Sequence, residues 1–492
     1  MFSIVRVLLL GGFVGKILGV FRELLGAWLF GTGLIANAFR LSQSAFLIPL
    51  HGFVSDAVNG GFTPNFSHWR EIDPPKAAAL FSGMHLILLA VSCFASILLF
   101  VFSPQWVVLL APGFDAESAA MATNMVRILT FALPAYAVVS LYAAADLVTG
   151  RGAITAARAS VQSIGLILGT LFAWYLKEPL LIPLGFVLSY FYLGIWGFLA
   201  ARAAGLVFDP RKHDWNLMRP ALLSSWKVFR VLFWVPVILQ INQIVERRVG
   251  SILNPESIAG LDYARFVTET LIILIAVPFA LAGQAKMSTM TKENFEMRAL
   301  YSIRILLIIG VPISIFLATN SELFVRLFFQ RGAFGESSVQ VTSAIISGQA
   351  IGIFAGLIAY AAQRFLNARG MNSAVLKATA IGACINITMN YFLGDYVGVQ
   401  ILGISGSCMA FAIAIIALNK LDLIQKLRRD FIFWISIILS NIAFIEVMNT
   451  FSGLGTTDKA IANMIFWLLI FLVFPKLRIE LIDFYKRLKT PD

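Results

Sequence analysis

The run AAALFSGMHLILLAVSCFASILLFVF, residues 77–102, contains no Asp, Glu, Lys or Arg. A bilayer core about 30 Å thick needs roughly 20 consecutive apolar residues in a helix, so this run predicts a membrane-spanning helix. The rest of the 492-residue chain has the same character, with 59% hydrophobic and 13% charged residues and a mean hydropathy of +0.84. Because soluble domains carry about 25% charged residues, this composition excludes a soluble globule.

Apolar runs of this size recur along the whole chain. They predict an all-α polytopic membrane protein with about fourteen transmembrane helices, and the connections are too short for an extramembrane domain that folds alone. The first run is expected to be a membrane helix, because it is too long for a signal peptide and lacks a clear cleavage site. The predicted spans are 3–30, 34–62, 77–102, 121–148, 155–176, 181–201, 221–249, 258–285, 299–319, 337–366, 372–393, 399–419, 431–450 and 459–475.

The chain has 38 Lys and Arg residues against 26 Asp and Glu residues, a net charge of +12. Most basic residues lie between apolar runs, so membrane topology explains the excess and no nucleic-acid partner is expected. With a cytoplasmic N-terminus, the basic residues gather on the cytoplasmic side. The opposite side then holds only Lys177, Arg326, Arg331 and Lys459. This asymmetry predicts an even number of spans, with both termini in the cytoplasm.

No cofactor and no metal are expected. The cysteines lie inside apolar stretches as small core residues, and the histidines lack metal-ligand spacing. The chain has no glycine-rich phosphate loop, which argues against ATP hydrolysis. The glycines of the first helix are expected to allow close packing or bending. These residues are Cys93, Cys384 and Cys408; His51, His68, His85 and His213; and Gly11, Gly12, Gly15, Gly19 and Gly26.

The sequence contains an internal repeat. The stretch from Ser103 to Phe114 resembles the stretch from Ser321 to Phe334, and each follows the third helix of a group of six. A short acidic turn and a long helix come after each copy. The repeat predicts an N-terminal six-helix lobe (1–205), a C-terminal six-helix lobe (206–425), and a final helix pair with a basic tail (426–492). Two repeated lobes suit a transporter that rocks one lobe against the other.

Charged side chains inside the predicted spans cost about 2.5–3.5 kcal/mol each at a helix centre. Most lie in the first, second, seventh and eighth spans, the leading helices of the two lobes. They predict a wet, cationic cavity for an anionic substrate, with arginine suited to phosphate. They are Lys16, Arg22, Glu23, Arg40, Asp56, Arg127, Asp146, Lys227, Arg230, Glu246, Arg247, Arg248, Asp262, Arg265, Glu269 and Arg364.

Several of these charges have an alternative, structural interpretation. Arg22 and Glu23 could neutralise each other as a pair, and Glu246 with Arg247 and Arg248 could form a structural ion pair. Near the cytoplasmic ends, Lys227, Arg230 and Arg364 could extend their head groups to the interface.

Several motifs resemble the MurJ/MviN lipid II flippases of the multidrug/oligosaccharidyl-lipid/polysaccharide exporter superfamily. Their order and spacing extend over most of the chain. The motifs are Leu18-Gly-Val-Phe-Arg-Glu23, Phe30-Gly-Thr-Gly33, Ala36-Asn-Ala-Phe39, Phe62-Thr-Pro64, Ala111-Pro-Gly-Phe114, Glu246 to Leu253, Leu261-Asp-Tyr-Ala-Arg265, Arg331-Gly-Ala-Phe334, Phe365 to Gly370, and Asn386 to Asn390.

The resemblance implies two six-helix lobes in a V shape, with a final helix pair forming a groove for a polyprenyl tail. It implies a flippase of the bacterial cytoplasmic membrane that moves an undecaprenyl-pyrophosphate-linked sugar, with lipid II as the leading substrate, for peptidoglycan synthesis and cell shape. Membrane lipids and cell-envelope synthesis proteins are the expected partners. A membrane potential or an ion gradient would drive transport, with sodium, chloride and proton all open as the coupling ion.

The resemblance also assigns site residues. Lys16, Arg22 and Arg265 would bind pyrophosphate, Glu23 would orient Arg22, and Arg40 would be a weaker member. The family's first-helix Ser-Arg appears as Gly15-Lys16, its Asp before Ala-Phe as Asn37, its second-helix Arg pair as Leu50-His51, and its nearby Glu as Ser55. Glu269 completes the candidate set. Arg265 is shifted by one place against the family pattern, which turns its side chain by about 100°.

Other functions compete with this interpretation. The departures at Gly15-Lys16, Leu50-His51 and Arg265 would suit a flippase for another lipid-linked glycan, such as an exopolysaccharide or O-antigen unit. A drug or cation antiporter should centre on acidic cavity residues, whereas cations predominate here. A non-transporting scaffold would not need costly buried charges. A polysaccharide polymerase would be the enzymatic alternative, and no catalytic residue is expected.

Overall fold

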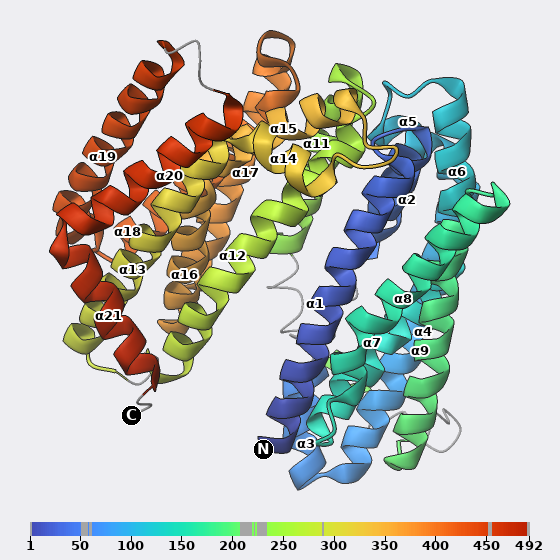
Figure 1. Cartoon of the computed structure of the whole chain (residues 1–492). Coiled ribbons are helices and arrows are strands. Elements are labelled where there is room, and N and C mark those ends of the chain that lie inside the picture. Colours follow the sequence, from blue (N-terminus) through green and yellow to red (C-terminus); the bar gives the residue numbers. More distant parts are fainter. Residues whose placement is uncertain are drawn as a thin grey trace. The chain divides into compact units, whose positions relative to one another are not determined.

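The computed structural model describes residues 2–50, 58, 62–206, 219–220, 222–223, 234–287, 290–450 and 455–489. Every regular element in these ranges is a helix (Figure 1), which confirms the predicted all-α class. The helices are α1 Phe2–Phe30, α2 Leu34–Leu50, α3 Thr63–Ile72, α4 Pro74–Val101, α5 Ser103–Leu110, α6 Ala116–Thr130, α7 Ala132–Val148, α8 Ala153–Leu176, α9 Leu181–Ala203, α11 Trp234–Leu253, α12 Ser257–Met287, α13 Lys292–Thr319, α14 Ser321–Phe329, α15 Glu336–Ile351, α16 Ile353–Ala368, α17 Asn372–Val397, η3 Gly398–Gln400, α18 Ile401–Lys420, α19 Ile424–Thr450, α20 Thr456–Val473 and α21 Pro475–Lys489.

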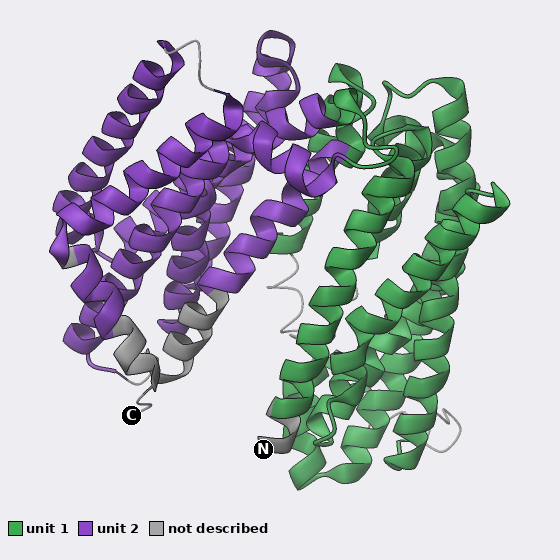
Figure 2. Ribbon diagram, in the orientation of Figure 1, with its two compact units in different colours: residues 1–259, 331–338 green, residues 260–330, 339–492 purple. Residues whose placement is uncertain are grey.

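Two compact units divide the chain (Figure 2): residues 1–259 with 331–338 form unit 1, and residues 260–330 with 339–492 form unit 2. Within unit 1, α8 packs along α1 and α9, α2 packs against α6, and α7 packs against α9. Within unit 2, α18 packs along α17 and α16, and α13 packs against α16. The predicted lobes at 1–205 and 206–425 rest on the internal repeat, and they stay a prediction.

By length and composition, the described part of the chain has seven helices that could cross a membrane, or nine if each of two bent pairs is one span. The stretch Asn372–Lys420 is one of the seven, although it contains α17 and α18, which pack side by side. Helices α1 and α12 are long but carry charged residues, and α2 is short. Twelve of the predicted spans fall on a helix or a bent pair, whereas 34–62 and 221–249 extend into residues that the structure does not describe. The count of fourteen membrane crossings stays a prediction.

Both copies of the internal repeat have the same local structure, but the long helix predicted after each copy is broken into two. Ser103 and Ser321 each begin a short helix, α5 and α14. Each short helix is followed by a bent pair: α6 and α7 meet at 46°, and α15 and α16 meet at 51°. A serine that stands seven residues before each short helix stabilises the bend. Ser96 Oγ donates to Thr130 O at 2.7 Å, and Ser314 Oγ donates to Ile351 O at 3.2 Å. These hydroxyls satisfy carbonyls that the break in the helix frees.

Glycines set the close packing of α8 against its neighbours. A Cβ on Gly11 would lie 2.5 Å from the Cβ of Ala156, and one on Gly165 would lie 2.4 Å from Gly185 O. Real Cβ atoms do not approach this closely, so side chains at these places would push the helices apart. The predicted role of the first helix's glycines in close packing is confirmed for Gly11 and Gly15.

Candidate functional site

The centre of the candidate site in unit 1 is a carboxylate held between two guanidinium groups. Arg22 Nη2 donates to Glu23 Oε1 at 2.6 Å, and Arg40 Nη2 donates to Glu23 Oε2. The Glu23 side chain is 3% exposed, whereas those of Arg22 and Arg40 are 25% and 13% exposed. The predicted contact of Glu23 with Arg22 is therefore present, and Arg40 shares the same carboxylate.

The turn between α1 and α2 brings these residues together. Gly31 has a φ of +56°, which an L-residue with a side chain rarely adopts. A Cβ at this position would also lie 2.4 Å from Ala333 O. The turn sends α2 back beside α1, so that Arg40 reaches Glu23 across the pair. The positive φ and the close approach of Ala333 O both require a glycine at this position. They explain why Gly31 belongs to the motif that precedes α2.

Residues 331–338, which belong to unit 1, pack against the same turn. Ala333 N donates to Trp28 O at 2.8 Å, and Thr32 Oγ1 lies 2.7 Å from Ser338 Oγ. Thr32 Oγ1 also donates to Glu256 Oε2 at 2.6 Å. The two motifs around Gly31 and Ala333 are therefore neighbours in space and form one polar junction.

Asn37 is buried, and its side-chain amide forms hydrogen bonds with backbone groups. Its Oδ1 accepts from Ala259 N at 2.8 Å, and its Nδ2 donates to Gly33 O at 3.0 Å and to Thr32 O. These bonds tie the start of α2 to the start of α12. The structure gives Asn37 a packing role, and its predicted role in substrate binding stays a prediction.

The remaining candidates lie on single helices. Lys16 is exposed on α1 and forms no ion pair in the described ranges. In unit 2, Arg265 is half-buried and Glu269 is exposed, one turn apart on α12. Residues one turn apart lie on the same helix face. The predicted cavity that would unite these residues with Arg22 stays a prediction.

Other predicted in-span charges have structural partners. Arg247 is buried and donates to Ile258 O at 2.8 Å, and Arg248 donates to Leu109 O at 3.1 Å. Asp146 Oδ2 accepts from Ile154 N at 3.1 Å, at the start of α8. Arg127 donates to Ser103 Oγ at 3.2 Å. Candidates that lie outside the described residues are His51, Ser55, Asp56, His213, Lys227 and Arg230.

Arg158 on α8 was not predicted as a site residue. Its guanidinium lies 4.6 Å from the ring centroid of Tyr136 and 5.7 Å from that of Tyr190. Its Nε also donates to the Tyr190 hydroxyl at 3.4 Å, and that hydroxyl donates to Gln162 Oε1 at 3.0 Å. The only signal in the sequence was an arginine inside the predicted span 155–176. The tyrosines that contact this arginine lie on two other helices, α7 and α9, so the span alone did not reveal them.

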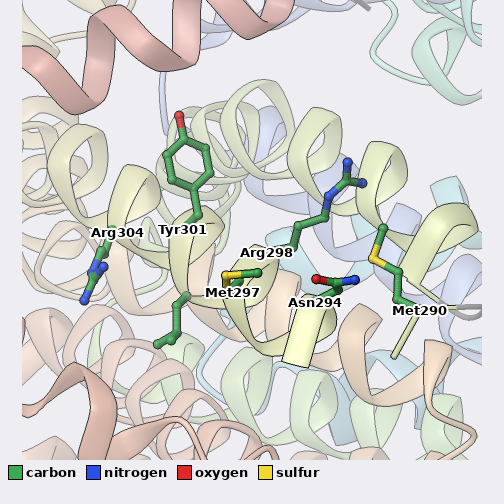
Figure 3. Close-up of a pocket in the computed structure, with 7 residues that line it drawn as sticks. Met290, Asn294, Met297, Arg298, Tyr301 and Arg304 are labelled. Carbon is green, nitrogen blue, oxygen red and sulfur yellow. The ribbon is translucent and has the colours of Figure 1, made fainter. Parts of the chain in front are cut away.

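Unit 2 contains a separate cavity of about 640 Å³ along α13. Figure 3 shows Met290, which precedes α13, on one side of the cavity and Arg304 on the other, with Asn294 and Arg298 of α13 between them. Arg304 donates to Asp430 at 3.0 Å, which links α13 to α19. None of the predicted site residues lines this cavity. In the described ranges, no group of three or more His, Cys, Asp or Glu side chains could hold a metal ion.

Comparison with known proteins identifies the family to which this chain is similar. The model of the family described as lipid II flippase MurJ matches residues 27–469. A probable lipid II flippase MurJ of Rickettsia prowazekii (strain Madrid E) is 25% identical over 404 residues, covering 78% of this chain and 76% of the relative. A similarly described protein of Rhizobium tropici is 25% identical over 452 residues, covering 85% of this chain and 79% of the relative.

Solved structures show the same fold. A lipid II flippase MurJ in an inward closed conformation has a TM-score of 0.78 at 19% identity, covering 98% of this chain and 99% of that chain. An inward-facing multidrug resistance MATE family transporter of the MOP superfamily has a TM-score of 0.66 at 13% identity, covering 84% of this chain and 96% of that chain. At these identities the likeness concerns the fold alone.

Proposed function

The chain belongs to the lipid II flippase MurJ family, since that family's model matches residues 27–469, and on this premise we propose that it moves lipid II from the inner to the outer leaflet for peptidoglycan synthesis. It is a multi-pass membrane protein, which we place in the bacterial cytoplasmic membrane with both termini inside. The observation that carries the proposal is the pair of guanidinium groups, of Arg22 and Arg40, that one buried carboxylate, of Glu23, holds in unit 1.

This cluster has the chemistry that a pyrophosphate needs. Guanidinium groups bind two oxygens of a phosphate at once, and a low local dielectric strengthens that attraction. Glu23 is held at 2.6 Å from Arg22 and also contacts Arg40, so it fixes the direction of both forks before substrate arrives. Lys16 on α1, and Arg265 and Glu269 on α12, are the further members of the proposed site. Transport is driven by a membrane potential or an ion gradient.

Binding of undecaprenyl pyrophosphate to the purified protein in lipid nanodiscs tests the site. Arg22→Ala should weaken binding about tenfold or more, because a charge-assisted hydrogen-bond pair is lost. Arg202→Ala is a matched control, because Arg202 is an exposed arginine at the end of α9. Equal binding by Arg22→Ala and wild type would remove the assigned role of Arg22.

A flippase for a different lipid-linked glycan is the second candidate. It is favoured by the departures from the family pattern at Gly15-Lys16 and Arg265, and by Leu50, a buried apolar residue where the family pattern has arginine. Depletion in the host separates the two. Accumulation of lipid II on the inner leaflet with failing cell walls supports the first proposal. Normal wall synthesis with loss of a surface polysaccharide supports the second.

A further inference from the structure

The cavity in unit 2 lies along one side of the first half of α13. Its lining residues within the helix recur every three or four positions, which places them on one helix face. The cavity volume of about 640 Å³ falls in the range of about 300–1,000 Å³ that is typical of ligand sites. The lining residues are Met290, Asn294, Met297, Arg298, Leu300, Tyr301 and Arg304.

This lining combines hydrogen-bond donors with apolar surface. Two arginines, an asparagine and a tyrosine supply the donors, and two methionines and a leucine supply the apolar part. Figure 3 shows the guanidinium of Arg298 and the hydroxyl of Tyr301 extending to the same side of α13. No aspartate or glutamate is among the lining residues that the structure describes. The cavity therefore has the chemistry to bind an anion that also has an apolar portion.

The two arginines of the cavity keep donors for a ligand. Arg298 is exposed and forms no ion pair with a described residue. Arg304 donates from Nε to Asp430 Oδ2 at 3.0 Å, and its side chain is 36% exposed. Because a guanidinium has five N–H donors, this bond leaves the Nη1 and Nη2 groups of Arg304 for a phosphate. The bond to α19 also fixes the direction of Arg304 before a ligand arrives, which lowers the entropy cost of binding.

The acidic side chains of this region do not neutralise Arg298. Glu296 on α13 forms an ion pair with Lys426, and Asp430 on α19 forms one with Arg304. Glu293 is exposed and stands five positions before Arg298, which turns it to a different side of the helix. The positive charge of Arg298 is thus available at the mouth of the cavity.

The place of the cavity in unit 2 favours a lipid as the ligand. Helix α13 packs against α19 and α21, and Figure 1 shows the start of α13 at the same end of unit 2 as the C-terminus. This end is cytoplasmic in the proposed orientation, and basic pockets between helices on that side bind anionic lipid head groups. After Asp430, α19 has an exposed apolar stripe that acyl chains can cover, formed by Ile432, Ile435 and Leu439.

We propose that the cavity along α13 binds the phosphate head group of an anionic glycerophospholipid, with Arg298 and the Nη groups of Arg304 on the phosphate oxygens. The two methionines and the leucine of the lining then contact the first part of the acyl chains. This lipid site is separate from the proposed transport site, because none of the residues assigned to transport lines the cavity. A lipid bound there stabilises the folded protein, since the unfolded chain has no such cavity.

The test measures binding of phosphatidylglycerol, phosphatidylcholine and glycerol 3-phosphate to the full chain in a neutral detergent. Wild type should bind phosphatidylglycerol most tightly, and its melting temperature should rise with the concentration of that lipid. Arg298→Gln should weaken binding of phosphatidylglycerol about tenfold, because a charge-assisted contact with the phosphate is lost. Arg298→Lys keeps the charge and should retain part of the affinity. Met297→Trp adds volume to the cavity without changing its charge, so it should weaken binding of the lipid more than that of glycerol 3-phosphate.

The matched control is Arg428→Gln. Arg428 is also an exposed arginine of unit 2, on α19 and two positions before Asp430, but it does not line the cavity. We expect Arg428→Gln to bind phosphatidylglycerol as wild type does. If Arg428→Gln and Arg298→Gln weaken binding equally, the lipid is attracted by a diffuse basic surface, and the proposed site is overturned.

The remaining outcomes also decide the proposal. Equal binding of phosphatidylglycerol by Arg298→Gln and wild type overturns it. Binding of glycerol 3-phosphate as tight as that of the lipid shows that the ligand is a soluble phosphate, which overturns the lipid assignment. Weaker binding of undecaprenyl pyrophosphate by Arg298→Gln, with phosphatidylglycerol unaffected, would place the cavity on the transport route and overturn the separate lipid site. Failure of the wild type to bind undecaprenyl pyrophosphate overturns the proposed function and leaves a phosphatidylglycerol site standing.

Discussion

Replacing Glu23 with glutamine should destabilise unit 1 more than the loss of an ordinary ion pair would. Glu23 is buried and contacts Arg22 at 2.6 Å, with Arg40 on its other oxygen. At an effective dielectric of about 20, two unit charges about 4 Å apart interact by about 4 kcal/mol. Glu23→Gln removes two such attractions, one to each of the two neighbouring guanidinium groups.

The net effect is smaller than the sum of the two attractions, because the variant no longer has to desolvate a carboxylate. Removal of one partner from a buried pair costs about 3–5 kcal/mol, and we expect the free energy of unfolding to fall by that amount. Thermal and denaturant unfolding of the purified protein measures it. Inorganic pyrophosphate should restore more stability to Glu23→Gln than to wild type, because an anion bound only by the folded state replaces the lost charge.

The control is Glu322→Gln, which removes a carboxylate that contacts Arg326 at 2.8 Å but is 59% exposed. Exposed pairs contribute about 0–1 kcal/mol, so this variant should be close to wild type. Equal stability of the two variants would refute the reasoning, since it would show that the buried carboxylate does not hold the two arginines together. Absence of any pyrophosphate effect on Glu23→Gln would refute the claim that the cluster binds an anion.

Three further predictions follow from local contacts. Asn37→Leu leaves the buried Ala259 N–H without its acceptor at 2.8 Å, so unfolding should become easier by about 1–3 kcal/mol in a denaturant titration. Gly185→Leu should push α8 and α9 apart, because even a Cβ at this position would lie 2.2 Å from Gly165 O. A crosslink between cysteines placed on α8 and α9 should therefore form more slowly than in the parent. Hydrogen bonds from the hydroxyl and the backbone N–H of Ser118 hold the pKa of Asp115 below its usual value of 3.8. Stability from this cap is therefore full above that value and is lost as the pH falls through the lower folded-state pKa, so the melting temperature of Asp115→Asn should depend less on pH than that of wild type.

The helices could be predicted from the sequence because their signal is local. An uncharged run such as 77–102 specifies a buried or membrane helix whatever surrounds it, and the structure has α4 there. The repeat was visible for the same reason, since Ser103 and Ser321 each begin a short helix. The bends were not predicted, because the predicted spans 121–148 and 337–366 were each taken as one helix, whereas the structure breaks them at Phe131 and Gly352.

The site was only partly predictable. Arg22 and Glu23 are adjacent in sequence, so their contact could be expected, whereas Arg40 reaches the same carboxylate only because of the turn at Gly31. Asn37 shows the opposite case, because its partner Ala259 is 222 residues away and gives no local signal. Arg158 was missed since its partners come from α7 and α9, and an arginine in a span does not reveal which rings will surround it.

Glu23 resolves a conflict that any membrane site for a pyrophosphate must meet. Several unpaired cations in an empty, partly dry site would repel one another and destabilise the fold, yet full neutralisation would leave no attraction for the ligand. One buried carboxylate between Arg22 and Arg40 removes most of the repulsion and holds both guanidinium groups in place. The rings of Tyr136 and Tyr190 stabilise Arg158 without neutralising it. Different partners, a carboxylate in one place and two aromatic rings in the other, thus stabilise the arginines of unit 1.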